Sequence, residues 1–117
     1  MIRTITIDGK PVRFCVSAAV PRIYRDRCGR DIFRDMQAVA EDLRASSEED
    51  TPLGAATLNT FENLAYCMAA AADPDGVPES AEKWLNQFSA LPIRVVFPQI
   101  ELLWLQNLAQ LNQPEQQ

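Results

Sequence analysis

The first hydrophobic pattern along the chain alternates at every second residue, as in a half-buried strand. Ile5 and Ile7 share one face, and after Asp8-Gly9 three apolar residues return on that face: Val12, Phe14 and Val16. Asp-Gly between two alternating runs is a strong signal for a hairpin turn. Pro11 has no N–H for the ladder, so the second strand should lie at an edge or begin after it. We therefore predict a β-hairpin over residues 4–16.

Two helices are predicted next, with a glycine between them. Pro21 suits the first turn of a helix that runs to about Cys28, and Gly29 can adopt the left-handed conformation that ends it. Asp31 is a good N-cap for the second helix. That helix has an apolar stripe at spacings near three and four, which we expect to be buried: Ile32, Phe33, Met36, Ala40 and Leu43.

A polar segment separates these helices from a third one. Residues 45–50 contain three adjacent acids and no apolar anchor, which is typical of a solvated loop. The third helix should begin between Pro52 and Thr57 and end at Ala72, with one apolar stripe: Leu58, Phe61, Leu64, Ala65, Met68 and Ala72. Asp73-Pro74-Asp75-Gly76 predicts a turn after it.

The last third of the chain predicts two more helices. Pro78 favours a helix start, and this fourth helix should run to about Phe88 with four residues on its buried face: Ala81, Trp84, Leu85 and Phe88. Residues 91–97 have two interpretations, either extended chain or the first turns of a long final helix kinked at Pro98. Residues 98–111 are predicted to be helical, and the polar residues 112–117 to fray.

These elements define a mainly α fold of the α+β class, with a small N-terminal β-hairpin followed by about five helices over residues 21–111. The chain has 117 residues, of which 47% are hydrophobic. That is enough to form one core without metal ions or disulfides, so residues 1–117 are expected to form one compact domain. We find no internal repeat in the sequence.

The charge and the apolar runs argue against nucleic acid and membranes as partners. The formal net charge of -5 would repel phosphate backbones and anionic lipid surfaces. Residues 1–10 do not resemble a signal peptide, and the longest apolar run, residues 65–72, is much shorter than the roughly 18 residues that span a bilayer. We therefore expect a cytosolic protein.

Few residues in the sequence suit catalysis or metal binding. The chain has no histidine, which removes Ser-His and Cys-His nucleophile pairs and the commonest general base near neutral pH. Cys15, Cys28 and Cys67 are widely spaced, so we expect free thiols and neither a disulfide nor a zinc site. The acids Glu48-Glu49-Asp50 lack the spacing of a calcium loop. We expect no enzyme activity, no catalytic residue and no cofactor or metal.

Two features are candidates for partner binding. The first is a group of arginines interleaved with acids, which favours surface ion pairs over nucleic-acid contact: Arg22, Arg25, Arg27, Arg30 and Arg34. The second is the last helix, whose expected buried face holds Ile100, Leu103, Trp104, Leu108 and Leu111. Leu102 and Leu105 widen its apolar surface, so this helix is either the central helix of the fold or meets a partner. Our candidate partner-binding residues are Leu102, Trp104 and Leu105.

The order of these motifs resembles the tail assembly chaperones of siphoviruses and related prophages over nearly the whole chain. The motifs are the Ile-rich strand with its Asp8-Gly9-Lys10 turn, Tyr24-Arg25, Gly29-Arg30-Asp31, residues 63–68, Glu82-Lys83-Trp84-Leu85 and Leu103-Trp104. The resemblance implies a non-enzymatic protein of the host bacterial cytoplasm, absent from the mature virion. Such a protein binds the tape measure protein, keeps it soluble and helps recruit the major tail protein. It also implies self-association as a homo-oligomer, and the chain looks like the short form of a family that also makes a longer, frameshifted form.

Two other interpretations remain open on the sequence alone. Another phage or prophage morphogenesis protein would have a similar fold but would stay in the particle. A small helical regulator would bind nucleic acid through the arginines of residues 22–34. 

Overall fold

The hairpin forms as the alternation predicts. In a computed structural model, which describes residues 1–46 and 53–112 with side chains up to Ala109, β1 (Ile2–Ile7) pairs antiparallel with β2 (Lys10–Cys15). Asp8 and Gly9 between them both have positive φ, 54° and 75°, as a two-residue hairpin turn of the primed type requires. Ile5, Ile7, Phe14 and Val16 are buried on one face, whereas Val12 is only half-buried.

Pro11 lies inside β2, so of the two alternatives, an edge strand or a strand that begins after Pro11, the structure shows the first. The strand register explains why Pro11 is tolerated. Ile7 and Lys10 flank the turn and form a hydrogen-bonded pair, so the next pair, Thr6 and Pro11, is a non-hydrogen-bonded one. Pro11 therefore removes no ladder hydrogen bond, and in this two-stranded sheet β2 is an edge strand, as expected.

The first two helices confirm the predicted caps. Helix α1 (Ala19–Cys28) ends at Gly29, which has φ 67° and donates its N–H to the carbonyl of Arg25. Helix α2 (Ile32–Ala45) begins after Asp31, whose carboxylate accepts hydrogen bonds from the N–H groups of Phe33 and Arg34. The first helix starts two residues before Pro21, which lies in its first turn.

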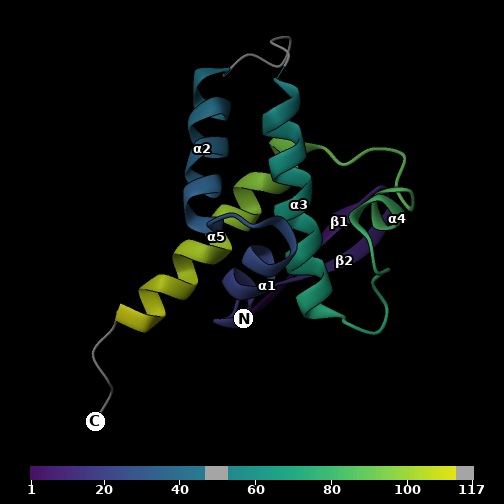
Figure 1. The fold of residues 1–117 in the computed structure, drawn as a ribbon, viewed down its shortest axis with the longest axis horizontal. Coiled ribbons are helices and arrows are strands. Elements are labelled where there is room, and N and C mark those ends of the chain that lie inside the picture. Colours follow the sequence, from purple (N-terminus) through teal and green to yellow (C-terminus); the bar gives the residue numbers. More distant parts are fainter. Residues whose placement is uncertain (47–52, 113–117) are drawn as a thin grey trace.

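Helix α3 (Ala55–Ala72) is central to the molecule. Figure 1 shows it between α2 on one side and the hairpin with α4 on the other. Because neighbours surround its C-terminal half, consecutive residues from Leu64 to Ala69 are all buried. Leu58 was expected on the buried stripe but is exposed. The first turn of α3 faces α2 through Thr57, whose hydroxyl donates a hydrogen bond to the Asp42 carboxylate, so the adjacent Leu58 points to solvent. The turn after α3 forms as predicted, with the N–H of Gly76 bonded to the carbonyl of Asp73.

Helix α4 is much shorter than predicted and covers only Ala81–Leu85. Ser80 caps it by accepting the N–H of Lys83, so the helix begins there and not at Pro78. The carbonyl of Pro78 instead accepts the hydroxyl proton of Tyr66 from α3. Trp84 is buried, and the other residues of the expected face are half-buried: Ala81, Leu85 and Phe88.

Residues 93–97 are helical, which decides between the two interpretations of this segment. Helix α5 (Ile93–Asn112) begins just after Pro92, whose carbonyl accepts from the N–H groups of Val95 and Val96, and it continues through Pro98. The second interpretation, in which these residues form the first turns of the long final helix and Pro98 lies within it, is therefore confirmed. The loop expected within residues 45–50 falls largely outside the described residues, as does the frayed end beyond Asn112.

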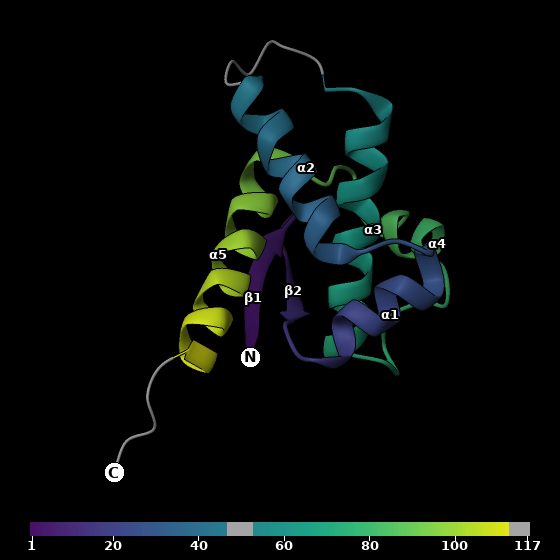
Figure 2. The same ribbon diagram turned by 60° about the vertical axis from the view of Figure 1, so that its left-hand side comes forward.

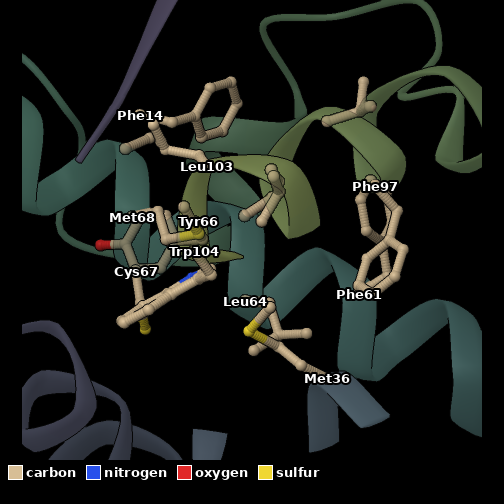
Figure 3. Packing of buried hydrophobic residues seen from close by; sticks show 14 of the residues in the cluster. Phe14, Met36, Phe61, Leu64, Tyr66, Cys67, Met68, Phe97, Leu103 and Trp104 are labelled. Carbon is tan, nitrogen blue, oxygen red and sulfur yellow. The ribbon is translucent and has the colours of Figure 1, made fainter. Parts of the chain in front are cut away.

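The hairpin and the helices pack into one globule around a common hydrophobic core, which confirms the predicted fold class. Figure 3 shows part of this core, including Phe61 of α3 against Phe97 of α5, with ring centroids 6.4 Å apart. A second aromatic cluster surrounds Trp84, which contacts the rings of Phe14, Tyr66 and Phe88. Within the described residues, no helix combines the length and apolar character that crossing a bilayer requires.

Candidate partner-binding surface

An apolar groove lies between α2 and α5 at one edge of the molecule. Its volume is ≈ 210 Å³. Figure 2 shows the two helices side by side, with α5 along the outer edge of the fold. The groove is lined mainly by apolar side chains of both helices: Phe33, Met36, Ala40, Trp104, Leu105 and Leu108. Gln37, Arg44 and Glu101 add polar groups, so the lining has one cationic and one anionic side chain.

The lining includes three large apolar side chains that water reaches. Phe33 is 47% exposed, Leu105 57% and Leu108 40%. We expected Leu105 to extend the apolar surface, and it does. For Phe33 and Leu108, the prediction of a buried face was wrong, because α2 and α5 leave a groove between these two side chains. The expected burial of Leu111 falls outside the described side chains.

Trp104 forms the floor of the groove. It is buried, and its ring packs edge-on against Phe33, with centroids 5.2 Å apart. The indole N–H is also buried and has no hydrogen-bond acceptor among the described residues. The structure thus brings two of the three predicted site residues, Trp104 and Leu105, to one groove. Leu102 is exposed but does not line this groove.

A buried carboxylate explains why Phe33 faces the groove. Asp35 is only 2% exposed and accepts hydrogen bonds from the Tyr24 hydroxyl at 2.6 Å and from the Arg30 guanidinium at 2.7 and 2.8 Å. Residues two apart on a helix point in nearly opposite directions, about 200° around the axis. Because Asp35 points toward Tyr24 of α1, Phe33 points away from α1.

The electrostatics of this network keep Asp35 charged. The Arg30 guanidinium lowers the pKa of the Asp35 carboxyl, against the opposing effect of burial, and the Tyr24 hydroxyl lowers it further. Burial and the Asp35 carboxylate together raise the pKa of Tyr24 well above its ordinary value, so its hydroxyl stays a donor. In the sequence, Asp35 is one of the acids interleaved with the arginines, a pattern that favours a surface ion pair and does not indicate a buried carboxylate. The nearby Arg30 was a weak sign of this pair, but Tyr24 could be identified only from the packing of α1 on α2.

Most of the arginines of residues 22–34 have partners within the chain. Arg22 pairs with Asp26 at 3.9 Å on the surface, as interleaved charges predict. Arg27 donates to the Tyr66 hydroxyl and to the Glu79 carbonyl, and Arg30 forms the paired contact with Asp35. These intramolecular contacts weaken the case for a phosphate-binding arginine cluster.

The three cysteines are free thiols, and Cys28 and Cys67 lie in surroundings that keep the thiol protonated. Cys67 is buried, and Cys15 and Cys28 are half-buried. Burial raises the pKa of the Cys67 thiol to about 12 and also raises the pKa of Cys28, so both stay protonated near neutral pH. A protonated thiol is a weak nucleophile. Across residues 1–46 and 53–112, no three Asp, Glu or Cys side chains come together so that they could hold a metal ion.

The α2–α5 groove is therefore the candidate site that the geometry supports best. It offers apolar contact area and a few polar groups, which suit the binding of another apolar surface more than a reaction. Comparison of the chain with protein-family models, with curated proteins and with solved structures found no match.

Proposed function

We propose that this protein is a non-enzymatic tail assembly chaperone that holds the tape measure protein in the α2–α5 groove. The observation that carries the proposal is the groove itself, where Phe33, Leu105 and Leu108 expose apolar side chains above Trp104. The order of sequence motifs, which resembles that of phage tail assembly chaperones, supplies the identity of the client.

The shape and lining of the groove fit an amphipathic helix. In helix-in-groove recognition, apolar anchors at spacings of three, four and seven residues enter a hydrophobic groove between helices. The tape measure protein is expected to be long and largely helical, so it would offer many such anchors. Gln37, Arg44 and Glu101 in the lining could hydrogen-bond or pair with polar groups beside those anchors.

The surroundings of the groove favour binding over chemistry. Its lining has no histidine or cysteine, and the protonated thiols of Cys28 and Cys67 lie outside it. A few partly exposed side chains also form a smaller apolar surface than permanent interfaces bury. We therefore expect reversible binding, in which the chaperone keeps its client soluble in the host cytoplasm, helps recruit the major tail protein and leaves before the tail is finished.

Charged substitutions on the walls of the groove test this proposal. In co-expression with the tape measure protein, Phe33→Asp and Leu108→Asp should each reduce co-purification at least about tenfold, because an unpaired charge would have to be buried against the client. Leu58→Asp is the matched control, since Leu58 is an exposed apolar residue of α3 outside the groove. Far-ultraviolet circular dichroism and melting temperature would establish that each variant is folded. Folded groove variants that retain the client as well as the control does would rule out this groove.

A second measurement separates a chaperone from a structural protein. Mass spectrometry of purified tails should detect the tape measure protein and the major tail protein but not this chain. Stoichiometric amounts of this chain in finished tails would instead support the alternative of a morphogenesis protein that stays in the particle.

A further inference from the structure

Helix α5 carries a second apolar stripe on its outer face, separate from the residues that it buries. The stripe consists of five exposed residues at alternating spacings of three and four: Val95, Pro98, Leu102, Leu105 and Ala109. Val95 is 55% exposed and Leu102 44%. These positions lie opposite the buried residues Val96, Ile100 and Leu103 on the helix. In Figure 2 no other described element covers the side of α5 that faces away from β1.

The order of apolar positions in this outer stripe is nearly the same in both directions along the helix. Leu102 and Leu105 lie equally far from the midpoint between Leu103 and Trp104, and so do Pro98 and Ala109. A two-fold axis at that midpoint would therefore place Leu102 of one copy against Leu105 of the other, and Pro98 against Ala109. Matching a surface to itself in this way is the requirement of a symmetric two-fold interface. Apolar residues at alternating spacings of three and four are typical of helices that pack against each other with a small crossing angle.

The residues that flank the stripe are compatible with this pairing. On one side lie Gln99 and Gln106, which would face each other across the axis without charge. On the other side lie Glu101 and Leu108. The same axis brings Glu101 of one copy closer to Leu108 of the other than to the second Glu101. Like charges are therefore not held opposite each other, although each copy has a net charge of -5.

We infer that the outer stripe of α5 is a self-association surface, on which a second copy of the chain packs with its α5 antiparallel. A contact between two helices over about four turns buries less than the roughly 800 Å² per partner of a standard interface, so the dimer should be weak and concentration-dependent. Leu105 belongs both to the stripe and to the α2–α5 groove. If the proposed function holds, a dimer and a bound client would compete for this residue, and the client would displace the second copy.

Measuring mass without any client tests the self-association. Sedimentation equilibrium of the full chain, from about 5 to 500 µM, should show the average mass rising from that of a monomer toward that of a dimer. Leu102→Asp should weaken the dimer at least about tenfold, because it buries two carboxylates close to the two-fold axis. Raising the salt concentration should strengthen the wild-type dimer, since it screens the repulsion between two acidic copies.

Phe33→Asp is the matched control, because Phe33 is an exposed apolar residue of the groove that is not part of the stripe. It should dimerise as the wild type does, even though the proposed function expects it to lose the client. A wild type that stays monomeric over the whole range would overturn the inference. So would a folded Leu102→Asp variant that dimerises normally, or a Phe33→Asp variant that does not dimerise, since the interface would then be the groove. None of these results depends on whether the client binds.

Discussion

Asp35 is a charged residue whose burial the sequence pattern does not reveal. A buried carboxylate is tolerated only when hydrogen bonds and an opposite charge replace its hydration. Here the Tyr24 hydroxyl and the forked guanidinium of Arg30 do so. They join α1, the residue after its C-cap and the first turn of α2. The network fixes the rotation of α2, on which the exposure of Phe33 depends.

We predict that Asp35→Asn destabilises the protein by about 1–3 kcal/mol at neutral pH, because it removes the charge of a buried carboxylate that hydrogen-bonds Tyr24 and the mainly exposed Arg30. The pKa of Asp35 is lowered in the folded state, so its stabilisation is present above its unfolded pKa of about 3.9 and is lost as the pH falls through the folded value. The difference between variant and wild type should therefore shrink below about pH 4. Urea unfolding at several pH values measures this.

Asp26→Asn is the control for that series. Asp26 pairs with Arg22 in an exposed i, i+4 contact, so its loss should change the free energy of unfolding by less than about 0.5 kcal/mol. An Asp35→Asn variant as stable as this control would show that the charge of Asp35 does not hold α2 in place.

At the residue scale, the sequence predicts caps and turns better than it predicts contacts between residues of different helices. The cap of Asp31 and the turn of Asp8-Gly9 follow from the chemistry of a few neighbouring residues, and both are confirmed. Phe33 was assigned to the wrong face, because an apolar stripe does not reveal which neighbouring helix supplies a hydrogen bond to Asp35. Leu105 was found because its apolar side chain exceeded what one buried face needs.

Gly29 illustrates how a single position defines the boundary of an element. Its φ of 67° allows α1 to end and the chain to turn directly into α2. A Cβ at this position would meet no atom within 4 Å, so the cost of a substitution would come from the backbone conformation alone.

We predict that Gly29→Ala lowers the free energy of unfolding by about 1–2 kcal/mol, because an L-residue with a Cβ is strained in the left-handed region. Gly29→Asn should lose clearly less, since asparagine adopts this conformation more readily. Gly54→Ala serves as a control at a glycine of ordinary φ, -67°, with equally open space. Thermal melts of the three variants give the order. Equal losses for alanine and asparagine at position 29 would argue against a conformational cause.

The wrong length predicted for α4 and the open choice at residues 93–97 have a common origin, because helix and loop compete in both segments. Helix α4 is five residues long because Ser80 caps it and the carbonyl of Pro78 bonds Tyr66 of α3, a contact from outside the segment. Residues 93–97 are rich in β-branched side chains yet helical, since Pro92 begins the helix and packing of Val96 and Phe97 in the core outweighs local preference. In both cases tertiary contacts decided what local pattern left open.

On the scale of the whole molecule, two aromatic groups connect the ends of the chain. Trp84 of α4 contacts Phe14 of the hairpin and Tyr66 of α3, while Trp104 of α5 contacts Phe33 of α2. Two long-range hydrogen bonds add to the first group, from Lys10 to the Gln87 carbonyl and from the Ser89 N–H to Asp8. The hairpin is thus held by the segment around α4, over 70 residues away in the sequence, and a hairpin of two strands is not stable alone.

These contacts predict that the hairpin, α4 and the α2–α5 groove unfold together in one cooperative transition. Each tryptophan reports on one part, so Trp104→Phe leaves Trp84 as the probe of the hairpin and α4, and Trp84→Phe leaves Trp104 as the probe of the groove. Within each variant, the fluorescence and far-ultraviolet transitions in urea should have the same midpoint and slope, which is the test of two-state behaviour.

Phe14→Ala in either background should lower the free energy of unfolding by about 3–5 kcal/mol, because it leaves a cavity beside Trp84. The same loss of free energy should be measured by Trp104 fluorescence, although the ring contact of Phe14 is with Trp84 and that of Trp104 is with Phe33. If Phe14→Ala shifted the Trp84 transition and left the Trp104 transition unchanged, the hairpin with α4 and the groove would be separate folding units. The groove could then remain formed, and able to bind a client, while the hairpin is unfolded.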